Sequence, residues 1–152
     1  MDKSDNQLIV LVILRVLIGW HFLYEGLIKL LDPTWSAVTY LNGAEGPFAS
    51  VFKAMARNEV ILGFIDFFNP VALAIVGLSL FLGLGSRWLS LGGVLLLLMY
   101  YLSYPPFIGL DQPMAEGNYL IVNKNLIEAC ALVVLFFSPE CHRIGLNRLF
   151  ER

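Results

Sequence analysis

Residues 8–31 read LIVLVILRVLIGWHFLYEGLIKLL, a run long enough to cross a bilayer that nonetheless contains four ionisable side chains. A charge at the bilayer centre costs about 3 kcal/mol even on insertion scales, so such residues normally face protein or a water-filled cavity. Because a helix turns about 100° per residue, the four fall within one arc of roughly 120°. The run therefore predicts a spanning helix with a polar stripe: Arg15, His21, Glu25 and Lys29.

The composition of the whole chain agrees with a membrane protein. Of its 152 residues, 58% are hydrophobic and 14% charged, and the mean hydropathy is +0.73, well outside the range of ordinary soluble domains. We expect one small integral membrane domain in contact with lipid. The net charge of −2 provides no basic patch, which excludes a nucleic-acid-binding protein. The N-terminal apolar run is too long for a signal-peptide core, so it is interpreted as a retained span.

The pattern predicts an all-α, four-helix transmembrane bundle with spans at about 8–31, 60–84, 88–104 and 119–138. Residues 32–59 are too polar to cross, and their helical spacing predicts two short amphipathic helices at the interface. In the second span, the Asn69-Pro70 pair predicts a break or kink. Gly77 and the pair Ser79 and Gly83 predict close packing between spans.

Charge distribution predicts the orientation of this bundle, because four spans put both termini on one side. Lys and Arg residues are more frequent on the side of the termini and the middle turn than on the other side, which predicts cytoplasmic termini. The first group is Lys3, Arg87, Arg143, Arg148 and Arg152, and the second is Lys53 and Arg57.

Depth along the spans predicts which polar residues meet. With a rise of about 1.5 Å per residue, Lys124 lies near the depth of Glu25, and Glu128 near that of His21. Asp66 and Asn69 reach a similar level, whereas Arg15 is deeper and has no evident partner, so it is assigned a structural role. The predicted catalytic residues are Glu25 and Glu128, which would manage protons, and His21, which would offer a donor contact. The predicted substrate-binding residues are Lys29, Lys124, Asn125, Asn69 and Asp66.

Two interpretations of this polar set stay open. It is either a functional site or a network of buried ion pairs that holds the helices in register. Aromatic residues near the predicted site would suit a quinone headgroup, although such residues also anchor spans at the interface. They are Tyr100, Tyr101, Tyr104 and Phe107, with Trp20 and Tyr24 on the first span. Cys130 and Cys141 have neither metal-type nor CxxC spacing and are interpreted as an apolar filler or a loop thiol.

Several short motifs in a fixed order resemble the DoxX/DoxD family. They are RVLIGWHFLYEGLIKL, the GPF at 46–48, the Asn69-Pro70 pair ahead of GLSLFLGLGSR, the YPP at 104–106, and NYLIVNKNLIEA at 118–129. The likeness extends from Arg15 to about Leu135. It implies a four-helix protein of the bacterial inner membrane. In the DoxD branch it implies the small subunit of a thiosulfate:quinone oxidoreductase, which oxidises thiosulfate to tetrathionate and passes electrons to quinone.

The sequence thus predicts a subunit or small enzyme of quinone-linked redox chemistry, with quinone as electron acceptor and no metal or flavin motif. A second membrane or periplasmic subunit, or further copies of the same chain, are the expected partners. Two other functions fit the same residues. One is a proton-coupled transporter of a small anion, for which intramembrane lysines and a proline in the second span are suitable. The other is a non-catalytic assembly subunit whose polar stripe docks another membrane protein.

Overall fold

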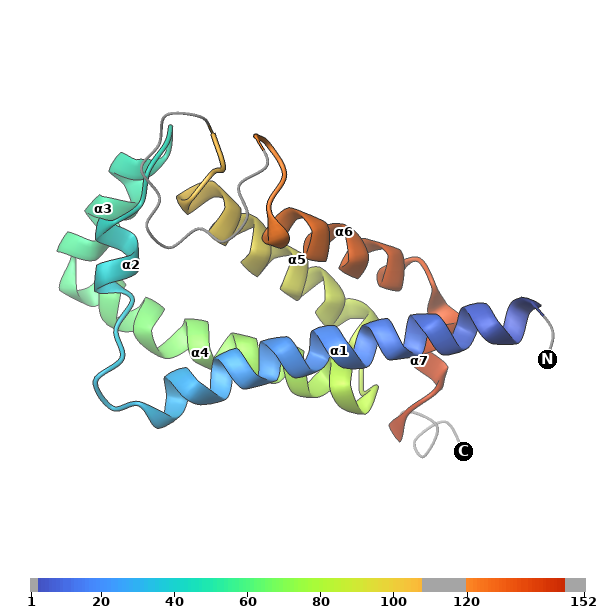
Figure 1. The fold of residues 1–152 in the computed structure, drawn as a ribbon. Helices are drawn as coiled ribbons and strands as arrows, with labels where there is room; N and C mark the ends of the chain where they lie inside the picture. Colours follow the sequence, from blue (N-terminus) through green and yellow to red (C-terminus); the bar gives the residue numbers. More distant parts are fainter. Residues whose placement is uncertain (1–2, 108–119, 147–152) are drawn as a thin grey trace.

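A computed structural model describes residues 3–107 and 120–146 of the chain, and the regular structure in these ranges is helical (Figure 1). The helices are α1 (Lys3–Leu31), α2 (Val38–Asn42), α3 (Ala49–Arg57), α4 (Glu59–Leu82), α5 (Ser86–Ser103), α6 (Lys124–Phe136) and α7 (Pro139–Arg143). No β-strand is formed within the described ranges, so the predicted all-α class is confirmed for them. Arg148 and Arg152, part of the predicted charge bias, lie outside these ranges.

Four long helices form the body of the molecule as two pairs. Helix α1 lies along α4, and α5 lies along α6, while contacts between α4 and α5 join the pairs (Figure 1). Their shared core includes the fully buried side chains of Phe22, Leu80, Leu132 and Leu135. Helices α2 and α3 cover one end of this body, and α7 packs against α1 at the other. The bundle arrangement leaves space between the pairs at the α2 and α3 end.

Glycine allows α1 and α4 to touch through their main chains. A Cβ added to Gly26 would lie 2.5 Å from the backbone nitrogen of Ala74, and one added to Gly77 would overlap the backbone of Leu23. The predicted close approach at Gly77 is therefore confirmed. Gly83 is also closely packed, since a Cβ there would lie 3.0 Å from Arg15 Nη2 of α1 and 3.0 Å from the Ile144 carbonyl oxygen. With a φ of 72°, Gly83 in addition ends α4, where Ser79 Oγ donates to the carbonyl of Leu84.

The predicted break of the second span at Pro70 is wrong, because α4 runs as one helix from Glu59 to Leu82, whereas the alternative, a kink, stays a prediction. Proline removes only one backbone hydrogen bond from a helix. Pro70 is buried, and its carbonyl oxygen lies against Gly26 of α1. Packing along α1 on both sides of Pro70 therefore keeps the helix continuous.

Helices α1 and α4 are long and apolar enough to cross a membrane. Most of their side chains face outward, and several large apolar ones are strongly exposed, including Leu17 (62%), Val60 (83%) and Phe67 (70%). A core helix of a soluble protein would bury these groups. Together with the composition, the two helices indicate association with a membrane.

Helix α6 is shorter than the span predicted for residues 119–138. It begins at Lys124, because the side chain of Asn123 accepts a hydrogen bond from the backbone nitrogen of Leu126 and caps the helix. Thirteen residues rise roughly 20 Å, less than the thickness of a hydrocarbon core. Residues 120–123 precede it in non-helical conformation, and the predicted start at residue 119 lies outside the described ranges.

The two short helices predicted within residues 32–59 are present as α2 and α3. They share a small core with the start of α4, made of Ala37, Leu41, Ala44, Phe52 and Ala56. Asp66 of α4 fixes the segment that leads into α2, because its carboxylate accepts hydrogen bonds from Ser36 Oγ (2.8 Å) and from the backbone nitrogen of Ala37 (2.7 Å). This attachment places α2 and α3 over the space between the two helix pairs.

Candidate functional site: a polar and aromatic cavity

A cavity of about 610 Å³ lies between the helix pairs beneath α2 and α3. Residues of α1, α4, α5 and the start of α6 form its walls. Its charged and amide-bearing lining residues are His21, Glu25, Lys29, Asn69, Asn123, Lys124 and Asn125. The aromatic ones are Phe22, Trp35, Tyr40, Phe52, Phe68, Tyr100 and Tyr104. The volume is that of a typical small-molecule site, mainly apolar with a few polar groups.

Three residues of the polar stripe of α1 line this cavity: His21, Glu25 and Lys29. His21 Nδ1 lies 2.8 Å from Glu128 Oε1 of α6, so the two residues matched by depth in the sequence meet. One turn further along α1, Lys29 Nζ lies 3.1 Å from Glu25 Oε2. The Lys29 side chain is mostly buried, at 20% exposure, whereas that of Glu25 is 47% exposed. The stripe thus carries two charge pairs, one between helices and one within α1.

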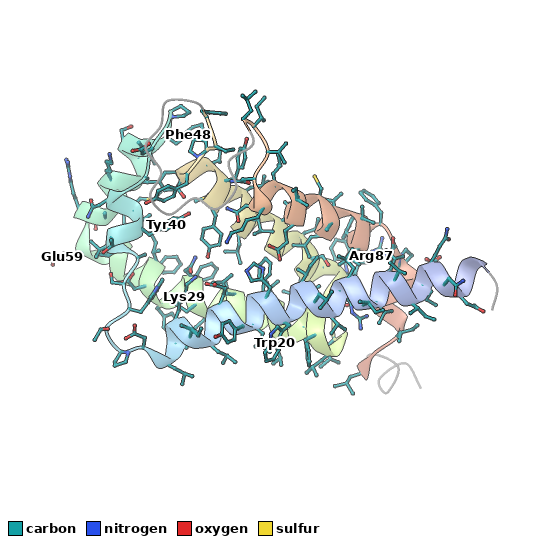
Figure 2. All side chains as sticks on the ribbon, viewed as in Figure 1. Trp20, Lys29, Tyr40, Phe48, Glu59 and Arg87 are labelled. Atoms are coloured by element: carbon teal, nitrogen blue, oxygen red, sulfur yellow. The ribbon has the colours of Figure 1, made fainter. Side chains whose placement is uncertain are left out.

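Lys29 is also held by aromatic rings. Its Nζ lies 5.8 Å from the ring centroid of Trp35 and 5.8 Å from that of Tyr100. Both rings line the cavity, and a cation near a ring face is attracted to its π electrons. Lys29 and Tyr40 are turned toward the interior of the bundle, whereas Trp20 is on the outer side of α1 (Figure 2). The ammonium is therefore fixed beside the cavity by one carboxylate and two rings.

A cluster of hydroxyl and amide groups also lines the cavity. Asn69 Nδ2 donates to Tyr100 Oη (2.7 Å), Ser103 Oγ donates to Tyr40 Oη (3.0 Å), and Tyr104 Oη donates to the Tyr40 carbonyl (2.8 Å). Burial raises the pKa of the Tyr40 phenol far above its usual value, so this hydroxyl stays protonated. Sequence reasoning missed Tyr40 and Ser103 as members of the site. Their signal was only a tyrosine in a polar loop and a serine at a helix end.

The other predicted substrate-binding residues divide into two groups. Lys124 and Asn125 line the cavity from the first turn of α6, as does Asn69 from α4. Asp66 does not line it, because both of its carboxylate oxygens are engaged by Ser36 and Ala37. Asp66 therefore positions the cover of the cavity. The physical reason is that Asp66 faces the segment before α2. The sequence alone did not predict where that segment lies.

Four of the aromatic residues predicted to surround the site do not line the cavity: Trp20, Tyr24, Tyr101 and Phe107. Trp20 and Tyr24 are both 54% exposed, and Trp20 packs against Phe81 with ring centroids 6.0 Å apart. Neither lines the cavity, because their positions on α1 face away from the polar stripe. Tyr101 donates its hydroxyl to the carbonyl of Ile121 (2.8 Å) and so ties the segment before α6 to α5.

Arg15 has a partner that the sequence did not reveal. The residue is 2% exposed, and its guanidinium Nη1 donates to the backbone carbonyl of Cys141 in α7. A Cβ added to Gly83 would lie 3.0 Å from Arg15 Nη2, so the guanidinium also reaches the end of α4. Cationic groups are favourable at helix C-termini, where carbonyls are unsatisfied. Arg15 thus fastens α7 to the bundle.

Replacing Arg15 by alanine is expected to release α7 and expose the thiol of Cys141. Burial raises the pKa of this thiol, which favours the unreactive protonated form and slows reaction with a maleimide. Without the guanidinium, the Cys141 carbonyl loses its charged donor, at a cost of about 2 kcal/mol. Maleimide labelling of Cys141 should become at least tenfold faster in a Cys130→Ser background. Unchanged labelling in Arg15→Ala would contradict this role, and Arg15→Lys is expected to show an intermediate rate.

No metal centre is apparent in the described part of the chain, where no group of three or more His, Cys, Asp or Glu side chains is placed to hold an ion. The polar groups around the cavity are instead two lysines, several amides and phenols, and His21 with its partner Glu128. Such groups bind and protonate ligand oxygens, and flat aromatic walls suit a planar ring.

The fold and this cavity define a helical, membrane-associated protein with a candidate site of mixed polar and aromatic lining. No family model, curated protein or solved structure matches the chain.

Proposed function

We propose that α1, α4, α5 and α6 cross a bacterial inner membrane as a four-helix bundle with both termini in the cytoplasm. The exposed apolar residues of α5 and α6, such as Leu95 (66%) and Ile127 (59%), support lipid contact for these shorter helices. Helix α6 needs the non-helical residues 120–123 to reach the outer surface. Such backbone is tolerated at membrane depth where it lines a cavity, as the buried Asn123 does. Helices α2 and α3 then lie at the outer interface.

Within this bundle, we propose that the cavity binds a quinone ring and that the protein is a DoxX/DoxD-like subunit or small enzyme of quinone-linked redox chemistry. The observation that carries the proposal is the meeting of flat aromatic walls with the Lys29 ammonium and with His21 in one cavity, where His21 is hydrogen-bonded to Glu128 of α6. A quinone has a planar ring, carbonyl oxygens that accept hydrogen bonds, and a need for protons on reduction. Each requirement has a matching group among the lining residues.

Lys29 and Tyr100 are the proposed contacts to a ring oxygen. Lys29 Nζ lies against the Tyr100 ring, so both donors are on the same side of the cavity. Tyr100 Oη accepts a hydrogen bond from Asn69, which directs its own O–H toward another acceptor. Asn125, in the first turn of α6, supplies a further amide donor. Two or three such donors fix the orientation of a ring between aromatic walls.

The His21–Glu128 pair is the proposed source of protons. With Nδ1 held by the Glu128 carboxylate, His21 can carry a proton on Nε2 and transfer it to a ligand oxygen. The Glu128 carboxylate stabilises the imidazolium form of His21. After the transfer, water can supply the pair with a new proton. Glu25 is the second carboxylate on this wall. Reduction of one quinone to a quinol takes two electrons and two protons.

Thiosulfate is the proposed electron donor, as the family resemblance implies. Two thiosulfate anions lose one electron each and join through a new sulfur–sulfur bond to give tetrathionate. The two electrons and two protons convert one quinone to quinol, so the reaction balances. Lys124, at the start of α6, and Lys29 are cationic contacts for an anion. A second membrane or periplasmic subunit, or a further copy of the chain, is the proposed partner in electron delivery.

Replacing Lys29 by leucine is expected to weaken quinone binding at least tenfold, because the ring oxygen loses a charged donor worth roughly 1.5–3 kcal/mol. Binding can be followed through Trp35, a cavity residue, after the other two tryptophans are changed by Trp20→Phe and Trp88→Phe. A ubiquinone analogue should quench Trp35 fluorescence saturably in the parent variant. Lys53→Leu, on α3 and away from the cavity, is the matched control. Quenching that does not saturate, or that is equal in Lys29→Leu, would reject the proposed site.

Small-anion transport is the second candidate, favoured by the presence of two lysines in the lining. The two functions differ in their products. Thiosulfate uptake into proteoliposomes without quinol formation would support transport, whereas quinol formation in purified protein or a stoichiometric complex would support the redox function. Loss of a co-purifying partner in Lys29→Leu, with neither activity present, would favour an assembly subunit.

A further inference from the structure

Two exposed apolar side chains belong to the lining of the cavity. Phe68 of α4 is 51% exposed and Met99 of α5 is 47% exposed, yet both line the cavity. The residues that follow them, Asn69 and Tyr100, are joined by a hydrogen bond of 2.7 Å, so Phe68 and Met99 lie at the same level on adjacent helices. These two side chains therefore mark an apolar opening of the cavity between α4 and α5.

The other exposed lining residues have a different chemistry. They are His21 and Glu25 of α1, at 45% and 47% side-chain exposure, and Lys124 at the start of α6. A water-soluble ion would pass these charged groups. An apolar chain would instead pass Phe68 and Met99 without desolvating any polar group.

The apolar opening is also at membrane depth. Phe68 lies nine residues after Glu59, the first residue of α4. At about 1.5 Å per residue, this places it roughly 14 Å along the helix from its outer end. The hydrocarbon core is about 30 Å thick, so the opening faces lipid tails near the middle of the proposed bilayer.

We infer that the opening between Phe68 and Met99 admits the alkyl chain of a membrane-resident amphiphile whose polar head occupies the cavity. The ligand then enters from the lipid and keeps its chain in contact with both the protein and the bilayer. The choice of a quinone ring as the head rests on the proposed function, whereas the chain route rests on the apolar opening alone. The chain contributes binding energy through apolar contact with these two side chains.

The test blocks the opening after the protein has folded. Met99→Cys in a Cys130→Ser background is modified with N-cyclohexylmaleimide, and Leu95→Cys, one turn earlier on α5 and outside the lining, is the matched control. Binding of a decyl-substituted benzoquinone and of the same ring without the chain is measured by Trp35 quenching. We expect modified Met99→Cys to bind the decyl compound at least tenfold more weakly and the bare ring within twofold of the unmodified protein. Modified Leu95→Cys should bind both as before.

Two results would overturn the chain route: unchanged binding of the decyl compound by modified Met99→Cys, or equal losses for both ligands. A second measurement does not depend on quinone binding. A decyl amide with a diazirine at its chain end should photolabel peptides containing Phe68 and Met99. Labelling there without any ring binding would reject the proposed function and support the chain route. Ring binding without such labelling would reject the chain route and support the proposed function.

Discussion

Gly77→Val is expected to destabilise the protein by about 3 kcal/mol or more, because the added side chain has no room between α1 and α4. Even a Cβ at this position would overlap the backbone of Leu23, so the helices must move apart. Main-chain contact along α1 and α4 also depends on Gly19 and Gly26. Denaturant unfolding can be followed by the fluorescence of Trp20, whose ring lies 6.0 Å from that of Phe81 across the same helix pair.

The control for this prediction is Gly63→Ala in the same helix. A Cβ at Gly63 would meet no atom within 4 Å, and alanine is favoured over glycine in helices by up to about 1 kcal/mol. Gly63→Ala should therefore be neutral or slightly stabilising. If Gly77→Val and Gly63→Ala unfold at the same denaturant concentration, the close contact between α1 and α4 is not a determinant of stability.

Glu128→Gln is expected to lower quinone reduction by roughly 10²-fold while leaving quinone binding within twofold, because proton transfer by a positioned group contributes about 10²–10⁴ to rates. The amide keeps the size of the side chain and a hydrogen bond to His21 but cannot hold a negative charge opposite an imidazolium. Turnover with thiosulfate as donor and binding through Trp35 quenching give the two readouts. Glu140→Gln, an exposed carboxylate on α7, is the matched control.

His21→Gln should lower turnover by a similar factor, and the double variant should lose little more, since the two residues act as one unit. Preserved quinone binding in these variants shows that they are folded. Wild-type turnover in Glu128→Gln would assign the His21–Glu128 pair to the alternative role of holding α1 and α6 in register.

The polar stripe of α1 and its depth relation to the later helix follow directly from the sequence. A helix has a fixed rise and turn per residue, so the spacing of His21, Glu25 and Lys29 puts them on one face. The same rise matched His21 to Glu128, which are hydrogen-bonded in the structure. Helix α1, the two short helices and the close approach at Gly77 were predictable for the same reason, because each depends on local residue pattern.

Other features depended on contacts between distant parts of the chain. Arg15 meets the Cys141 carbonyl, 126 residues away, through an acceptor that is backbone and therefore has no residue-type signature. Asp66 belongs to the cover of the cavity because it faces the segment before α2. Pro70 stays helical because α1 packs along α4, so tertiary contact overrides a local preference.

By itself, the sequence determined that this is a highly apolar helical protein with a polar stripe on its first long helix, because composition and periodicity are local properties of the chain. Only the tertiary structure decided which groups share a cavity. Tyr40 and Ser103, 63 residues apart, meet at its wall, and Phe68 and Met99 open it between two helices. Those relations follow from how the helix pairs pack and where α2 and α3 fold over them, which the spacing of residues along one helix does not specify.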